Sequence, residues 1–166
     1  MTKGVIDIRR VAGALGAEIH GVDLSRELDD ETFAAIRRAF LDHQVIFFRD
    51  QKLTPDQHKA FGRRFGPLNI HPYVTGMPGH PEIMEIIKEP SDKLNFGGGW
   101  HSDMSFLEKP SIGSILYALE VPPYGGDTLF ASMTAARDAL PPGLRQTPTP
   151  LPAIHSASRQ YSAQGP

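Results

Sequence analysis

Two side chains that can bind a metal ion, His101 and Asp103, stand two positions apart in residues 100–106. Apolar and polar residues alternate in this segment, which predicts a β-strand. Residues i and i+2 of a strand point to the same face, so we expect His101 and Asp103 to lie side by side on an inward face. An imidazole nitrogen and a carboxylate oxygen would then be presented together, which is the start of a metal site.

This pair offers two of the three ligands of the facial triad, two histidines and one carboxylate, by which some proteins hold Fe(II). With 7 histidines and 11 aspartates in 166 residues, about 0.5 His-x-Asp pairs arise by chance, so the bare pair is weak evidence. The alternative is an ordinary solvated strand pair. The surroundings favour a site, because the pair follows Gly97-Gly98-Gly99 and a second predicted strand begins after Gly125-Gly126-Asp127.

The elements that must position this pair are short and separated by turns. Glycine (16) and proline (15) make up about 19% of the chain, against about 12% in an average protein, which favours many short strands over a helical bundle. β-Branched and aromatic residues and alternating patterns mark the candidate strands. We expect strands near residues 6–9, 17–20, 45–48, 83–87, 100–106, 111–119 and 128–130.

Three helices are predicted from their capping residues. The first opens on acidic residues at 29–31 and ends near His43. The second starts at a threonine cap, with proline at the first helical position and a glutamine that completes a capping box, and it ends at Gly66. The third runs from a cap at Ser132 to Leu140, where two prolines stop it. The apolar positions expected to face inward on the first two are Phe33, Ile36, Phe40, Leu41, Phe61 and Phe65.

Composition excludes several classes of function. The balance of 17 basic and 19 acidic residues gives a net charge of −2, so there is no basic surplus for nucleic acid. No apolar run approaches the ~18 residues of a membrane span, and the first residues lack the apolar stretch of a signal peptide. The absence of cysteine excludes disulfides, thiolate metal sites and cysteine nucleophiles, and it fits a cytoplasmic location.

Five further motifs stand in order between about residues 6 and 145. They are residues 16–24 (GAEIHGVDL), 43–51 (HQVIFFRDQ), Phe65-Gly66-Pro67, His71-Pro72 and 125–130 (GGDTLF). Together with residues 100–106, their order and spacing resemble the taurine dioxygenase (TauD/TfdA-like) family of Fe(II)/2-oxoglutarate-dependent oxygenases. The resemblance implies a mixed α+β, mainly β fold: a double-stranded β-helix, or jelly-roll, with helices packed outside.

The resemblance also implies roles for individual residues. His101 and Asp103 match two iron ligands, Thr128 matches a threonine that hydrogen-bonds the 2-oxoglutarate carboxylate, and His71 matches a histidine of the substrate pocket. Thr128 as an ordinary strand residue and His71 as a loop histidine are the alternatives. The implied cofactor is Fe(II), with 2-oxoglutarate as cosubstrate and with O2 and a small anionic organic molecule (a sulfonate, sulfate ester or carboxylate) as substrates. No further side chain is assigned a catalytic role.

The pattern departs from the family after residue 146. The family's second iron-binding histidine and its 2-oxoglutarate-binding arginine come later than this chain extends, and His155 stands in a different sequence context. Residues 1–146 are therefore expected to be the N-terminal part of a jelly-roll that is incomplete at its C-terminus. Residues 147–166 are expected to form an irregular Pro/Ser-rich tail, and the chain to be truncated and inactive alone. A catalytically dead anion- or partner-binding module and a cupin-like metal binder stay open as alternatives, as does a homo-oligomer.

Overall fold

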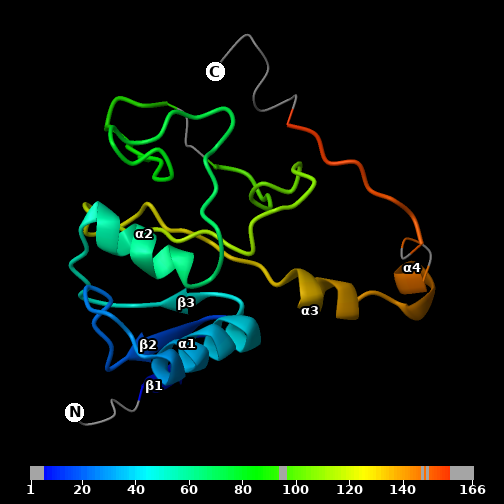
Figure 1. Cartoon of the computed structure of the whole chain (residues 1–166). Coiled ribbons are helices and arrows are strands. Elements are labelled where there is room, and N and C mark those ends of the chain that lie inside the picture. Colours follow the sequence, from blue (N-terminus) through cyan, green and yellow to red (C-terminus); the bar gives the residue numbers. More distant parts are fainter. Residues whose placement is uncertain (1–5, 94–96, 147, 149, 158–166) are drawn as a thin grey trace.

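The computed structural model describes residues 6–93, 97–146, 148 and 150–157. Figure 1 shows a small sheet with two helices beside it, long irregular segments, and two short helices further along the chain. The predicted glycine-rich loop begins at Asn95, and its first two residues lie outside the described part. Among the described residues, no helix is both long and apolar enough to cross a membrane.

Three short strands form the sheet, in the order β1-β2-β3. β1 (Asp7–Arg10) pairs antiparallel with β2 (Ala17–His20), and β2 pairs parallel with β3 (Ile46–Phe47). A parallel pair needs a crossover connection, and the helix α1 (Asp30–His43) supplies it. These strands confirm the three predicted within residues 6–48, with β3 shorter than expected.

α1 begins where the sequence predicts, because the Asp29 side chain accepts a hydrogen bond from the backbone N–H of Thr32. Its buried residues are Phe33, Ile36 and Ala39. Leu41 was expected to face inward but is exposed. Ala39 is buried in its place, because the stripe that faces the sheet follows a three-residue spacing along this helix.

α2 (Pro55–Arg63) has the predicted capping box: the Thr54 side chain accepts from the Gln57 backbone, and the Gln57 side chain accepts from the Thr54 backbone. The predicted inward aromatic residues of this region form a cluster of edge-to-face pairs. Ring centroids are 4.9 Å apart for Phe33–Phe65, 5.4 Å for Phe61–Phe65 and 5.7 Å for Phe48–Phe61. This cluster joins α1 and α2 into one core.

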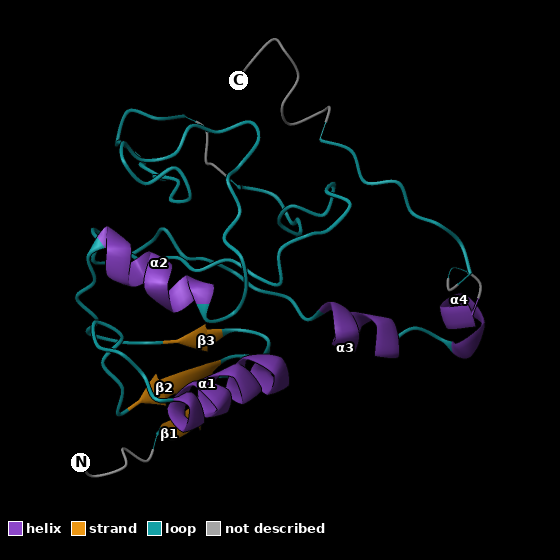
Figure 2. Cartoon of the chain, viewed as in Figure 1, coloured by secondary structure: helices purple, strands orange, loops and turns teal. Residues whose placement is uncertain are grey.

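The later predicted strands do not form. Within the described chain, residues 66–131 contain no strand, although strands were predicted at 83–87, 100–106, 111–119 and 128–130. Figure 2 shows this part of the chain as loop. An extended segment becomes a strand only when a partner satisfies its backbone, and residues 108–131 make no backbone–backbone hydrogen bond among the described residues. Two jelly-roll sheets are therefore not present in the described residues, and helices outnumber strands in place of the expected mainly β content.

The last two helices are short. α3 (Met133–Asp138) is capped by Ser132 as predicted, and it ends two residues before Leu140. The prolines at 141–142 were expected only to stop a helix, but Pro142 also begins α4 (Pro142–Gln146). Proline is tolerated at a helix start because its missing N–H would have no partner there. The described residues beyond α4 form no helix or strand.

Candidate functional site

His101 and Asp103 lie next to each other, but not on a strand. The Nε2 atom of His101 is 3.1 Å from Oδ1 of Asp103. Residues 103–106 form a turn in which Met104 has a positive φ of 54° and the N–H of Leu107 donates to the Met104 carbonyl. The predicted strand and inward face are thus wrong, since no neighbouring strand pairs with this segment and the side chains are 47% and 57% exposed. Their predicted side-by-side placement is confirmed.

Hydrogen bonding fixes which nitrogen of His101 faces the carboxylate. Nδ1 lies 2.8 Å from the carbonyl oxygen of Gly99, and a carbonyl only accepts, so Nδ1 carries the hydrogen. In the neutral ring Nε2 then directs its lone pair toward Asp103. Gly97 has a positive φ of 69°, and a Cβ there would lie 3.3 Å from Cε1 of His101. A glycine at this position therefore leaves space for the imidazole.

The donor set of this pair fits a divalent metal ion. A ring nitrogen and a carboxylate oxygen converge at 3.1 Å: the protonated ring would form an ion pair there, and the neutral ring would offer both atoms as ligands to a metal ion. Two ligands that meet a metal at a right angle with bonds of ~2.1 Å lie ~3 Å apart, close to the observed separation. The hydrogen bond from Nδ1–H to a backbone carbonyl is the usual means of orienting a metal-binding histidine.

A third residue, Ser114, forms a hydrogen bond with the Asp103 carboxylate. The Ser114 hydroxyl lies 2.8 Å from Oδ2 and donates to it, so each carboxylate oxygen has its own neighbour. Sequence reasoning missed Ser114, because a serine in an expected strand carries no signal of its own. Its contact spans eleven positions and depends on how residues 103–114 fold back.

His71 lies in a loop that approaches the same turn through aromatic rings. Its Nδ1 accepts hydrogen bonds from the backbone N–H groups of Tyr73 and Val74, at 3.2 and 3.0 Å. Nε2 is therefore the protonated nitrogen and the donor of the neutral ring. The His71 and Tyr73 rings are 6.2 Å apart, and Tyr73 lies 5.9 Å from Phe106. This series of rings connects the His71 loop with the turn that follows Asp103.

Thr128 is exposed and lies in an irregular segment after two glycines with positive φ, Gly125 and Gly126. Two residues later, the Phe130 ring lies 6.3 Å from the Phe47 ring of β3. No contact in the described structure joins Thr128 to His101 or Asp103. The expected strand at 128–130 is absent, so the backbone does not direct Thr128 toward the pair. His155 is also exposed, and no group of three His, Asp or Glu side chains in the described part could hold a metal ion.

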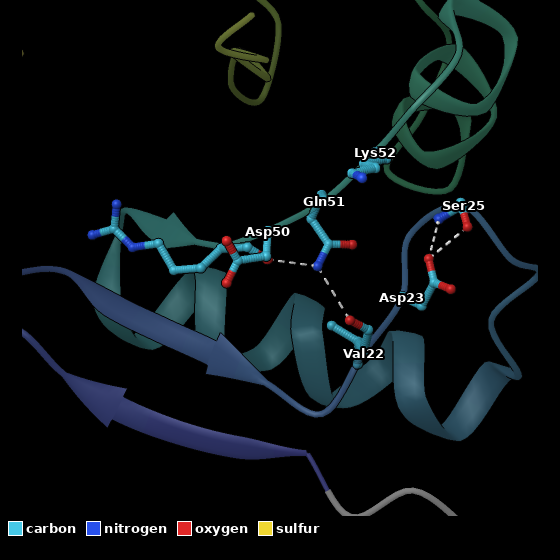
Figure 3. A pocket seen from close by; sticks show the side chains of 7 residues that line it. Val22, Asp23, Ser25, Asp50, Gln51 and Lys52 are labelled. Carbon is cyan, nitrogen blue, oxygen red and sulfur yellow. Dashed lines mark hydrogen bonds between the residues drawn. The ribbon is translucent and has the colours of Figure 1, made fainter. Parts of the chain in front are cut away.

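Two cavities lie elsewhere, in the N-terminal part of the molecule. The larger, about 510 Å³, is lined by Val22, Asp23, Ser25, Arg49, Asp50, Gln51 and Lys52 (Figure 3). Its polar groups are largely engaged within the chain: the Gln51 amide donates to the carbonyls of Val22 and Arg49 and accepts from the Leu24 N–H. Hydrogen bonds from the side chain and backbone of Ser25 lower the pKa of Asp23.

The second cavity, about 360 Å³, lies between residues 24–28 and α2. Neither cavity is lined by any of the four predicted site residues. His101, Asp103 and Thr128 are exposed and His71 is partly exposed, and all four lie outside these two cavities.

Comparison with known proteins covers nearly all of the chain. Residues 7–165 match the family model described as "Taurine catabolism dioxygenase TauD, TfdA family". An alpha-ketoglutarate-dependent sulfate ester dioxygenase from Pseudomonas putida is 37% identical over 97% of this chain and 53% of its own length. An alkylsulfatase from Acinetobacter baylyi is 36% identical over 97% of this chain and 50% of its own length.

Solved structures give a similar result. The crystal structure of a taurine dioxygenase from Burkholderia xenovorans superposes with a TM-score of 0.71 at 38% identity. The alignment covers 84% of this chain and 50% of that one. The chain therefore spans about half the length of the curated relatives and of the solved structure it matches.

Proposed function

Because the chain belongs to the taurine catabolism dioxygenase TauD, TfdA family, we propose that it supplies two iron ligands to an Fe(II)- and 2-oxoglutarate-dependent dioxygenase. The family match confirms the resemblance predicted from the motifs. The proposed reaction hydroxylates an aliphatic carbon of a small anionic substrate, with release of succinate and CO2. The relatives' names refer to sulfate esters and an alkylsulfatase, so a sulfate ester is the first substrate class to test.

The observation that carries this proposal is the His101–Asp103 pair. Nδ1–H of His101 donates to the Gly99 carbonyl, and Nε2 lies 3.1 Å from a carboxylate oxygen of Asp103. When bound there, Fe(II) would supply the binding and activation of O2. His101 would hold the ion through a neutral nitrogen, and the Asp103 carboxylate would offset part of its charge.

The remaining roles follow the chemistry of each side chain. The Thr128 hydroxyl would donate to the 2-oxoglutarate carboxylate, which requires the exposed segment around it to come close to the metal pair. His71, protonated on Nε2, would donate to the anionic head group of the substrate. Its Nδ1 is held by two backbone N–H groups, so the neutral ring keeps this donor orientation without a positive charge.

The test is an anaerobic titration of the 166-residue chain with Fe(II) and 2-oxoglutarate. We expect a weak visible charge-transfer absorbance only when both are present. The absorbance should disappear in His101→Ala and persist in His155→Ala, a control that removes an exposed histidine not joined to the pair. Absence of the absorbance in the unsubstituted chain, or its persistence in His101→Ala, would overturn the proposed metal role.

The isolated chain is expected to be inactive or nearly so. Two protein ligands, without a clamp for the distal 2-oxoglutarate carboxylate, leave the reactants poorly oriented, and each lost anchor costs ~10²-fold or more in rate. Succinate formation with Fe(II), ascorbate, 2-oxoglutarate, O2 and a panel of sulfate esters, sulfonates and carboxylates measures this. Substrate-stimulated succinate at a rate typical of enzymes, abolished by His101→Ala, would show that the chain suffices on its own.

A further inference from the structure

We propose that Ser114 is a positioning residue for the Asp103 carboxylate, and that the N-terminal core holds Ser114 in place. This inference rests on the proposed metal role of His101 and Asp103. It concerns a residue that neither the sequence motifs nor the facial-triad chemistry singles out.

The contact divides the two oxygens of Asp103 between two partners. Oδ1 faces Nε2 of His101 at 3.1 Å, while Oδ2 accepts from the Ser114 hydroxyl at 2.8 Å. The terminal torsion of an aspartate is broad, so the carboxylate plane is not fixed by the backbone alone. A donor on Oδ2 selects the plane in which Oδ1 points toward the imidazole nitrogen. Ser114 thereby pre-orients a ligand atom without touching the metal position.

Hydrogen bonds fix the chain immediately after Ser114. Nε2 of His58, on α2, donates to the Ile115 carbonyl at 3.2 Å. The Tyr117 hydroxyl accepts from the Leu53 N–H at 3.1 Å and donates to the Gln51 carbonyl at 3.2 Å. Ile115 is thus bonded to α2, and Tyr117 is bonded to residues 51–53, just before α2.

Packing fixes the chain on both sides of Ser114. A Cβ at Gly113 would lie 3.1 Å from Cζ of Phe40, so the backbone rests against an α1 side chain. A Cβ at Gly62 of α2 would lie 3.7 Å from Cδ1 of Ile115, so that side chain lies against α2. We call residues 113–117 the anchored segment. Its attachment to both helices makes Ser114 a fixed donor within an otherwise irregular region.

Cobalt(II) titration of the full chain, followed by visible absorption, measures the effect on metal binding. The sharpest pair of variants is Ser114→Thr and Ser114→Val, which have nearly the same shape and differ in the hydroxyl. We expect Ser114→Thr to bind Co(II) like the unsubstituted chain and Ser114→Val to bind it about 10-fold more weakly, the lower end of the range for lost outer-shell partners. Ser111→Ala, which removes an exposed serine from the same stretch, is expected to change nothing.

Two outcomes would overturn the inference, and they are distinct. Equal Co(II) affinity in Ser114→Thr and Ser114→Val would remove the hydroxyl from any positioning role while leaving the metal role of the pair intact. Failure of the unsubstituted chain to bind Co(II) would overturn the proposed function, and with it this inference. Because Thr and Val have matching shapes, a general loss of folding would affect both variants. The ratio of their Co(II) affinities therefore reports the effect of the hydroxyl alone.

Discussion

Residues 6–65 and residues 97–131 are both rich in apolar side chains, yet only the first region buries them. Every buried hydrophobic residue in the described structure lies between Ala17 and Phe61. In the second region Leu119 is 80% and Leu129 71% exposed. The first region forms its own sheet and core, because the crossover helix α1 brings β3 beside β2 within thirty residues of chain. The second forms no strand, and its residues 108–131 make no backbone–backbone hydrogen bond among the described residues.

This contrast bears directly on the candidate site. The proposed metal ligands, His101 and Asp103, belong to the poorly packed region, whereas the residues that hold the anchored segment belong to the well-packed one. Ser114 lies where the two meet.

Amide hydrogen exchange should separate the two regions most strongly. Amides of β2 and the middle of α1 are expected to be protected ~10³-fold or more, since they open only with global unfolding of a domain of ordinary stability. Amides of residues 118–131 should exchange almost as fast as in an unstructured peptide, because no backbone carbonyl of the described residues accepts from them. Exchange read by mass spectrometry after proteolysis gives both values. Strong protection of residues 118–131 would contradict the contrast.

Core truncation should be costly in one region only. Ile36 is fully buried, so Ile36→Ala is expected to lower the free energy of unfolding by about 2–5 kcal/mol. Leu119→Ala removes a similar aliphatic side chain that is already in water, so a change within about 0.5 kcal/mol is expected. Urea denaturation of both variants measures the difference. A comparable loss in Leu119→Ala would mean that residues 111–119 are packed in solution.

These two regions also show what the sequence allowed us to predict. The start of α1 and the capping box of α2 follow from residues within one helical turn, such as Asp29 or Thr54, so local chemistry was sufficient. The strands predicted at 100–106, 111–119 and 128–130 depend on pairing with distant segments, which a pattern of alternation does not reveal. The predicted pair of His101 and Asp103 kept its proximity even though the strand was wrong, because residues i and i+2 stay close in a turn as well.

The contact between Ser114 and Asp103 could not be predicted from sequence motifs. Nothing in its own neighbourhood distinguishes it from Ser111 or Ser105, and its role follows from a turn, a fold-back and an anchor on α2. Contacts of this kind depend on the tertiary structure. They are found only after the chain has been folded and each polar atom's partner identified.

Acid should release the anchored segment before it unfolds the core. Burial lowers the pKa of His58, partly offset by its bond to the Ile115 carbonyl, so the folded state holds this ring neutral. The unfolded chain binds a proton near pH 6.5, so the contribution of His58 to stability is present above that pH and is lost as pH falls through the lower folded pKa. The pKa values of Glu18, beside Arg49, and of Asp23, which accepts hydrogen bonds from Ser25, are also lowered. These carboxylates are protonated only at more acidic pH, so they do not contribute to the change between pH 7.5 and 5.

The measurement is hydrogen exchange of the Leu53 amide, which donates to the Tyr117 hydroxyl of the anchored segment, between pH 7.5 and 5, corrected for the intrinsic pH dependence of exchange. We expect protection to fall across this range in the unsubstituted chain. His58→Gln should remove the pH dependence while leaving β2 and α1 protected. An unchanged pH profile in His58→Gln would assign the titration to another group.

The smallest expected effect comes from Tyr117→Phe, which removes one hydroxyl from the anchored segment. The ring remains in place, but the Leu53 N–H loses its acceptor and the Gln51 carbonyl loses its donor. Net loss of such hydrogen bonds costs about 1 kcal/mol, and water can replace part of them at this half-buried position. Exchange of the Leu53 amide should therefore accelerate several-fold, and Co(II) binding should weaken less than in Ser114→Val. Tyr124→Phe is the matched control, because Tyr124 is 86% exposed and has no hydrogen bond or ring contact with the described residues. If Tyr117→Phe and Tyr124→Phe behave alike, the hydroxyl does not hold the segment. If Tyr117→Phe instead weakens Co(II) binding as much as Ser114→Val does, the anchor, and not the serine alone, sets the orientation of Asp103.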